Sequence, residues 1–206
     1  MSGRGVVVVA VGPRANEAAH GLLGSLVPYV YPVTLVTDRP QEFPDVETRC
    51  PTDSSWGARE SKLSLFVDPP YDLILYLDAD TEVLRDPSPL FTPLEDGWHV
   101  VVAPSTWQDE DVLQHVDRVD REETVTALGT GSVLQLQAGV VAYRRCPEVK
   151  ALAEAWLDEW RHYGKHDQGA LLRALYERPV RVWIVGHAFN GGNVVAHHWG
   201  RARGRQ

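Results

Sequence analysis

Short apolar runs alternate with helical patterns along the first half of the chain. Residues 6–11, 33–37 and 73–77 are short runs dominated by Val, Leu and Ile, typical of strands buried on both faces of a sheet. Residues 17–27 and 59–67 instead carry apolar side chains at helical spacing. This alternation predicts an α/β fold with a mostly parallel central sheet flanked by helices.

The second half of the chain has the same kinds of element in a less regular order. The predicted elements are strands at 99–103, 133–144 and 180–185, and helices at 147–161 and 168–177. The strand at 133–144 is predicted either as one strand or as a hairpin interrupted by Gly139. Trp156 has the spacing of a core-facing residue on its helix, which favours packing over a cofactor-binding role.

Composition narrows the classes of protein and of partner. The chain has 206 residues, 44% hydrophobic and 23% charged, as expected of one folded domain. Its net charge of −8 disfavours nucleic acid as a partner, because binding to phosphate backbones needs an excess of Lys and Arg. Only Cys50 and Cys146 are present, which favours a reducing compartment. With no apolar run of transmembrane length, a cytoplasmic location is predicted.

Two carboxylates follow the third apolar run directly. Asp78 and Asp80 are one residue apart at the carboxyl end of the predicted strand 73–77. Open α/β sheets bind ligands at that edge, and paired carboxylates hold Mg²⁺ or Mn²⁺ together with substrate phosphates. Taken alone, the pair is equally typical of a turn after a strand. The metal hypothesis therefore depends on other parts of the chain.

Four further patterns carry side chains suited to a phosphorylated sugar substrate. Each has an ordinary structural explanation when taken alone: a solvated lysine, a bulged strand, a helix N-cap and surface histidines. The patterns are Lys62 on the predicted helix 59–67, Gln137-Ala138-Gly139, Asp167-Gln168 at the start of a helix, and His197-x-x-Gly200-x-x-Arg203. Their joint presence, in this order, favours the functional interpretation.

Together these residues resemble the retaining glycosyltransferases of family 8, which include the glycogenins and bacterial lipopolysaccharide galactosyltransferases. The resemblance runs from about Val6 to Arg203 and is closest at 62–83 and 138–172. It implies a GT-A nucleotide-diphospho-sugar transferase fold with a Rossmann-like N-terminal half. It also implies a single domain with a nucleotide-sugar and metal half at 1–103, a variable loop at 104–132 and a donor-sugar and acceptor half at 133–206.

The resemblance further implies a Mn²⁺ or Mg²⁺ ion and a donor, most simply a UDP-sugar. Asp78, Asp80 and His197 would coordinate the ion, while Asp167, Gln168 and Lys62 would act on the donor sugar and its diphosphate. The implied donor-binding residues are Val9, Ala10, Val11, Gly12, Asp38, Lys62, Asp78, Ala79, Asp80, Gln137, Ala138, Gly139, Asp167, Gln168, His197, Gly200 and Arg203. The acceptor has no recognisable motif; it could be a glycan, a protein, a lipid-linked glycan or a small molecule. A nucleic-acid hydroxyl stays open as an acceptor, although the net charge disfavours it.

The sequence departs from the family pattern at two places. Gln137 stands where the family usually has Asn, which predicts a changed set of hydrogen bonds to the sugar. Arg203 replaces the usual terminal Lys, and the Lys-Pro-Trp ending is absent. A looser closure over the diphosphate is therefore expected.

Other classes of protein share part of this pattern. A haloacid-dehalogenase-type phosphatase also has Asp-x-Asp after a strand, but Glu82 stands where that class has Thr or Val. A nucleotidylyltransferase would have a basic, Gly-rich loop after its first strand, and residues 11–15 do not provide one. A non-catalytic nucleotide-sugar or metal-binding domain would share the fold and differ only in having no turnover.

Overall fold

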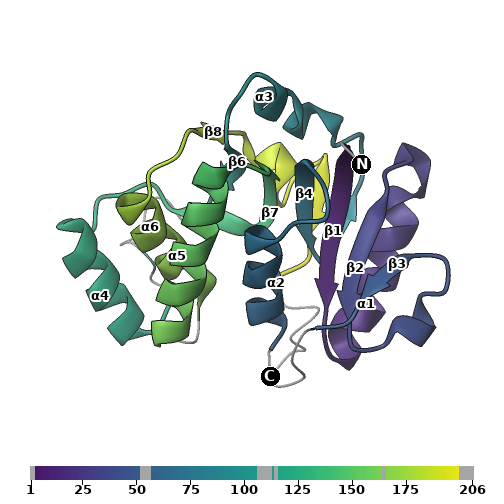
Figure 1. Cartoon of the computed structure of the whole chain (residues 1–206), viewed down its shortest axis with the longest axis horizontal. Coiled ribbons are helices and arrows are strands. Elements are labelled where there is room, and N and C mark those ends of the chain that lie inside the picture. The colour runs from purple at the N-terminus through teal and green to yellow at the C-terminus, as the bar shows by residue number, and fades with distance from the viewer. Residues whose placement is uncertain (1–2, 52–56, 106–112, 114–115, 164–165, 200–206) are drawn as a thin grey trace.

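The chain folds around a central seven-stranded sheet, with strand order β3-β2-β1-β4-β7-β6-β8 (Figure 1). The computed structural model describes residues 3–51, 57–105, 113, 116–163 and 166–199. The strands are β1 Arg4–Ala10, β2 Val33–Thr37, β3 Glu47–Arg49, β4 Leu73–Asp78, β5 Thr81–Val83, β6 Val100–Pro104, β7 Leu136–Arg144, β8 Val182–Ile184 and β9 Val195–His197. The α-helices are α1 Pro13–Leu26, α2 Ala58–Val67, α3 Thr92–Glu95, α4 Arg118–Leu128, α5 Pro147–Tyr163 and α6 Asp167–Glu177. Short 3₁₀ turns occupy Val27–Tyr29 (η1), Pro40–Glu42 (η2), Ser88–Leu90 (η3) and His187–Phe189 (η4).

The central sheet is mostly parallel, as predicted. β1 pairs in parallel with β2 and β4, β2 with β3, and β6 with β8. Only β7 runs the other way among these strands, antiparallel to both β4 and β6. Because of this reversal, the beginning of β7 lies beside the end of β4, where Leu77 pairs with Val140. The two segments that carry Asp78 and Gly139 are thereby brought together.

Alternate side chains of β1 pack into two separate core layers, one on each face of the sheet. Val7 and Val9 belong to the layer under α2, α5 and α6, whereas Val6 and Val8 belong to the layer under α1. Burial on both faces explains why this strand is continuously apolar. The prediction of an α/β sheet with helices on its faces is confirmed.

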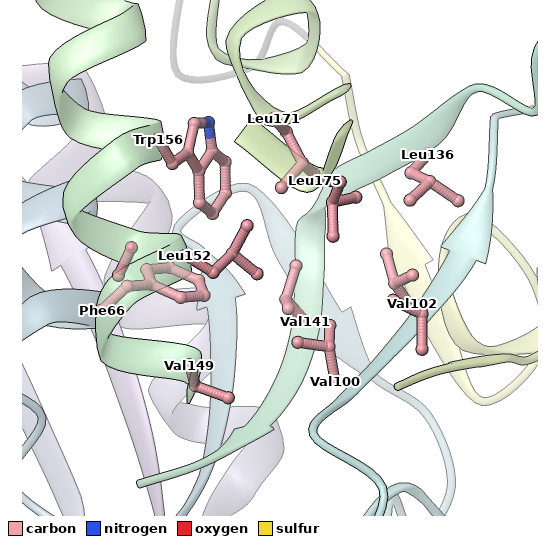
Figure 2. A pocket seen from close by; sticks show the side chains of 12 residues that line it. Phe66, Val100, Val102, Leu136, Val141, Val149, Leu152, Trp156, Leu171 and Leu175 are labelled. Atoms are coloured by element: carbon pink, nitrogen blue, oxygen red, sulfur yellow. The ribbon is translucent and has the colours of Figure 1, made fainter. Parts of the chain in front are cut away.

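Trp156 packs in the core, as its spacing predicted. Its ring meets the edge of Phe66 with centroids 5.0 Å apart. Figure 2 shows both residues beside an apolar cavity of about 20 Å³, between the sheet strands β6, β7 and β8 and the helices α5 and α6. The cavity is lined by side chains such as Val141, Leu152 and Leu171. Since these side chains offer a water molecule no hydrogen-bond partner, we regard the cavity as a packing gap of the core.

Two sequence predictions about local structure were wrong or incomplete. β7 is one continuous strand through Gly139, so the hairpin alternative is wrong. The three-residue strands β3, β5 and β9 were not predicted, because so few residues carry no measurable periodicity. Part of the predicted variable loop at 104–132 forms α4, and its residues 106–112 and 114–115 lie outside the described residues.

In the described part of the chain, no helix has both the length and the apolar character needed to cross a bilayer.

Candidate active site

Asp78 and Asp80 meet His197 at the carboxyl end of β4. The Nε2 atom of His197 lies 3.2 Å from Asp80 Oδ1 and 3.9 Å from Asp78 Oδ2. One potential ligand atom from each residue falls within 4.8 Å of the others. The side chains of His197 and Asp80 are 5% and 11% exposed, and Asp78 is 31% exposed, so the group opens to solvent on the side of Asp78. The structure thus brings together the three predicted metal ligands.

The small sheet formed by β5 and β9 carries His197 to this place. Thr81, which follows Asp80 directly, pairs with His197 in an antiparallel register. The N–H of His198 donates to the carbonyl of Asp80, and the Thr81 hydroxyl donates to the carbonyl of Asp78. The backbone of the Asp-x-Asp turn is therefore fixed at the same point where the histidine arrives.

Gly139 makes room for this group. A Cβ atom at this position would lie 2.3 Å from His197 Cε1 and 2.8 Å from Asp78 Oδ2, closer than real contacts permit. A glycine here is therefore a steric requirement of the site.

Asp78 is held on one side and open on the other. Tyr76, two residues earlier on the same face of β4, donates its hydroxyl to Asp78 Oδ1 over 2.7 Å. Lys62 Nζ lies 3.4 Å from the same oxygen. Burial, reinforced by the Asp78 carboxylate, raises the pKa of Tyr76 well above its usual value, so the phenol stays protonated and remains a donor. Oδ2 is left facing His197.

Lys62 is a buried cation whose three N–H groups all point at acceptors. Besides Asp78, its Nζ donates to Asp167 Oδ2 at 2.9 Å and to the carbonyl of Ala138 at 2.7 Å. Burial alone would lower the pKa of Lys62, but the Asp167 and Asp78 carboxylates raise it above its usual value. This lysine therefore links α2 to β7, to the start of α6 and to the Asp-x-Asp turn.

Asp167 lies at the first turn of α6 and is 13% exposed at its side chain. Burial alone would raise its pKa, but the charges of Lys62 and Arg59 hold the pKa of Asp167 well below its ordinary range. Arg59 Nε lies 3.6 Å from Asp167 Oδ1. The indole N–H of Trp156 donates to the Asp167 carbonyl at 2.7 Å, which ties the start of α6 to α5. Asp167 is accordingly an ionised, firmly positioned acceptor.

The two glutamines predicted to bind the sugar are neighbours. Gln168 Nε2 donates to Gln137 Oε1 at 3.3 Å, and Gln137 Nε2 reaches Ser105 Oγ at 3.4 Å. Gln137 is 8% exposed. Its side chain therefore connects β7 with α6 and with the residue that follows β6.

The predicted nucleoside edge lies at the ends of β1 and β2. Gly12 follows β1 with a φ of 93°, and its N–H donates to Asp38 Oδ1 at 3.0 Å. Asn16, on the first turn of α1, donates to the same Asp38 oxygen at 2.8 Å. Burial alone would raise the pKa of Asp38, but these hydrogen bonds outweigh it, and the pKa lies below its ordinary value. Val9 and Ala10 are buried and only Val11 and Gly12 are partly exposed, so any ligand here meets mainly the turn.

Not every predicted residue can be placed, and some contributors were missed. Gly200 and Arg203 lie outside the described residues. Arg59, Tyr76 and Asn16 were not predicted as part of the site. Tyr76 could have been found from the two-residue period of a strand, and Arg59 from its place one turn before Lys62. Asn16 had no local signal.

Two carboxylates and an imidazole suit Mn²⁺ or Mg²⁺. Ligands about 2.1 Å from one ion lie roughly 3 Å apart when they meet at a right angle, close to the 3.2 Å between His197 and Asp80. The space left by Gly139 and the open side at Asp78 also fit. The residues present are compatible with a bound divalent cation.

A second group of potential ligand atoms lies at the other end of the sheet. His99, Cys146 and Glu148 place one ligand atom each within 4.8 Å of the others. His99 precedes β6 and Cys146 follows β7, at the edge where β4 begins. This group has no counterpart among the sequence predictions.

Two solved structures of other proteins have a similar fold. The apo form of mouse xyloside xylosyltransferase 1 matches with a TM-score of 0.60 and 13% identity, over 90% of this chain and 86% of that one. The apo structure of the bifunctional glycosyltransferase WbbM matches with a TM-score of 0.54 and 16% identity; 89% of this chain is covered, against 39% of WbbM. A scan of protein-family models and a search of curated proteins gave no match. The architecture described above, together with these likenesses, identifies the chain's fold as the GT-A glycosyltransferase fold.

Proposed function

We propose that this chain is a metal-dependent glycosyltransferase that moves a hexose from a UDP-sugar to a hydroxyl group of an acceptor, with retention of configuration. The observation that carries the proposal is the meeting of Asp78, Asp80 and His197 at the carboxyl end of β4. This is the edge of an open α/β sheet at which ligands bind, beside the point where strand order reverses between β1 and β4. The resemblance to family 8 supports retention.

In this proposal Asp78, Asp80 and His197 hold Mn²⁺ or Mg²⁺. When bound, the ion neutralises negative charge on the diphosphate and so favours its departure. Asp78 contributes Oδ2, because Oδ1 is engaged by Tyr76 and Lys62. Gly200 and Arg203 remain proposed contacts to the diphosphate on the strength of the resemblance.

The donor sugar would lie between Asp78 and the start of α6. Asp167, ionised and held by Lys62 and Arg59, would accept hydrogen bonds from sugar hydroxyls. Lys62, which contacts both Asp167 and Asp78, would hold these two carboxylates at a fixed distance from each other. Gln168 and Gln137 would border the anomeric carbon. The nucleoside would extend toward the turn at Gly12 and Asp38.

The transfer breaks the bond between the anomeric carbon and the diphosphate oxygen and forms a bond from the acceptor oxygen to that carbon. The acceptor proton ends on the released diphosphate or in solvent. Asp167 is a weak nucleophile because two cations stabilise its charge. We therefore assign it to orienting the donor and expect no trapped glycosyl–Asp167 intermediate in mass spectra of the turning-over enzyme.

A panel of nucleotide sugars with and without Mn²⁺ tests the proposal. A thermal-shift screen should identify one donor that raises the melting temperature only when Mn²⁺ is present, because preferential binding stabilises the folded state. With that donor, release of the nucleoside diphosphate should require Mn²⁺ and be lost in Asp80→Ala and His197→Ala. Product anomers read by NMR would establish retention or inversion.

Cys146→Ser is the matched control, because it removes a potential ligand from the other group of the same sheet. It should leave turnover unchanged. Full turnover in Asp80→Ala, or release of phosphate without Mn²⁺, would exclude the proposed transferase. Donor binding without any release would instead indicate a non-catalytic domain.

A further inference from the structure

Asn190 is a fully buried polar residue that touches one of the proposed metal ligands. It follows the 3₁₀ turn η4 and has 0% exposure. Its Oδ1 atom lies 2.8 Å from Nδ1 of His197. The other ring nitrogen, Nε2, is the one that faces Asp80 and Asp78. Asn190 thus contacts the histidine on the side away from the carboxylates.

The loop between Asn190 and β9 fixes this contact. The N–H groups of Gly191 and Gly192 both donate to the carbonyl of Val195, and Val194 donates to Ala188. Gly191 has a φ of 94°, in the region that favours glycine, and a Cβ there would lie 2.6 Å from the Trp199 ring. The turn therefore holds Asn190 beneath the histidine with little freedom.

The imidazole is also confined on one face and at one edge. Trp199 stacks on His197 with ring centroids 5.1 Å apart and an interplanar angle of 27°. Gly139 approaches the ring edge at Cε1 so closely that no side chain fits there. A ring flip that exchanged Nδ1 and Nε2 would need these neighbours to move.

The chemistry of the amide oxygen determines where the imidazole proton lies. A carbonyl oxygen can only accept, so its partner Nδ1 must carry a proton. In a neutral imidazole the proton on Nδ1 leaves Nε2 with a free lone pair. Without the oxygen, Nε2 could keep the proton and donate it to Asp80, and the lone pair would face away from the carboxylates.

The amino group of Asn190 has no equivalent task. Among the described residues, its Nδ2 atom is buried without a hydrogen-bond partner. Unsatisfied buried donors are costly and rare in folded proteins. Among the described residues, the Asn190 side chain therefore has one hydrogen-bond partner, Nδ1 of His197, and its oxygen makes that contact.

We propose that Asn190 is a positioning residue, which keeps the imidazole proton of His197 on Nδ1 so that Nε2 can bind the divalent cation. The inference rests on the proposed function for the identity of the ligand. Histidine ligands of metals generally donate their second ring nitrogen to such an acceptor, and loss of the acceptor weakens binding.

Two variants separate the oxygen from the rest of the side chain. Asn190→Asp keeps an acceptor beside Nδ1 and replaces the amino group, which has no partner in the described part of the chain, by a second oxygen and a negative charge. Asn190→Leu keeps the volume and removes the acceptor. Long-range ¹H–¹⁵N NMR of the metal-free protein, at a pH where the ring is neutral, reports the protonated nitrogen of His197. Electron paramagnetic resonance of free Mn²⁺ reports affinity.

We expect the wild type and Asn190→Asp to show a proton on Nδ1, and Asn190→Leu to shift it to Nε2. Mn²⁺ should bind about 10- to 100-fold more weakly to Asn190→Leu and at least as tightly to Asn190→Asp. A proton on Nε2 in the wild type would overturn the inference, and this measurement needs no variant to fold. Equal weakening in both variants would overturn it too, since that is what a packing role predicts.

The outcomes also distinguish the two proposals. If the wild type binds no Mn²⁺, the proposed function fails and the role of Asn190 fails with it. If the wild type binds Mn²⁺ and Asn190→Leu binds it equally well, only the role of Asn190 is overturned.

Discussion

The sheet carries a group of close ligand atoms at each of its ends, and the two groups differ in what surrounds them. At the end of β4, Nδ1 of His197 faces an amide oxygen, which directs the free lone pair of Nε2 to the carboxylates. At the opposite edge, Nδ1 of His99 accepts from the backbone N–H of Arg181. The lone pair of Nδ1 is thereby engaged, and on the other side of the ring the guanidinium of Arg181, itself a cation, lies 3.5 Å from Nε2.

Charge and protonation reinforce this difference. Burial raises the pKa of the Cys146 thiol, which disfavours the thiolate that would be the ligand. The positive charges of Arg181 and Arg144 near His99 oppose a cation at that edge. At the other edge, the charge of Lys62 is matched by two carboxylates. Short distances between potential ligand atoms therefore do not by themselves make a metal site. The hydrogen bonds and charges around those atoms determine whether they can bind a cation.

The largest expected difference between the two ends of the sheet concerns the basic side chains Lys62 and Arg181. Lys62→Met should lower the free energy of unfolding by about 3–5 kcal/mol, because it leaves the carboxylate of Asp167 buried without its closest counter-charge. Arg181→Met, at the exposed edge, should change it by roughly 0.5 kcal/mol or less. Urea denaturation measures both. Similar losses in the two variants would contradict the contrast.

The second-largest expected difference between the two ends of the sheet is their effect on Mn²⁺ binding. At a Mn²⁺ concentration 100 times its dissociation constant, the wild type should gain about 2.7 kcal/mol of stability. Asp80→Asn should lose this gain, and Glu148→Gln should keep it. Melting temperatures with Mn²⁺ or a chelator provide the measurement. If the gain in stability were lost in Glu148→Gln instead, the ion would bind at the edge of His99 and Cys146, and the proposed site would be wrong.

Acid should destabilise the proposed active site selectively. The pKa of Asp167 is lowered in the folded state, so its contribution is present above its unfolded pKa of about 4 and is lost as the pH falls below that value. Between pH 5 and 2.5, the wild type should lose about 2 kcal/mol more than Asp167→Asn, which does not ionise. Denaturation curves at several pH values would show parallel losses if Asp167 did not contribute.

The smallest effect concerns two buried tyrosines. Tyr76→Phe removes the hydroxyl donor to Asp78 and should cost about 1–2 kcal/mol and weaken Mn²⁺ binding about 10-fold. Tyr143→Phe removes a hydroxyl that donates to the carbonyl of Leu65, away from the site, and should cost about 1 kcal/mol without changing Mn²⁺ affinity. Equal affinities of the two variants would show that Tyr76 does not orient Asp78.

The sequence predicted the central sheet and its helices better than the hydrogen bonds that connect the residues of the candidate site. Residues 33–37 form β2 with the predicted bounds, and the GT-A fold and mostly parallel sheet are confirmed. Asp78, Asp80 and His197 were predicted to meet, and they do. Their roles as ligands remain a prediction, as do those of Asp167 and Gln168.

Asn190 and the β5–β9 pairing could not be predicted. β9 has three residues, and its partner is chosen by a register that no local periodicity records. Asn190 reads as a loop residue between a phenylalanine and two glycines. Its importance depends on which side of His197 faces it, and that is fixed only by tertiary structure. Tyr76, in contrast, was accessible from strand periodicity.

The pairing of β9 with β5 has a consequence for the order in which the protein is made. All seven strands of the central sheet are encoded before β9, since the last of them, β8, ends at Ile184. A nascent chain halted on the ribosome just before Val195 already contains the whole sheet, both aspartates and the Lys62 network. It lacks His197, the buried residue Val195 and the proposed diphosphate contacts Gly200 and Arg203. During synthesis the central sheet is therefore complete in sequence before the chain can form its proposed cation site.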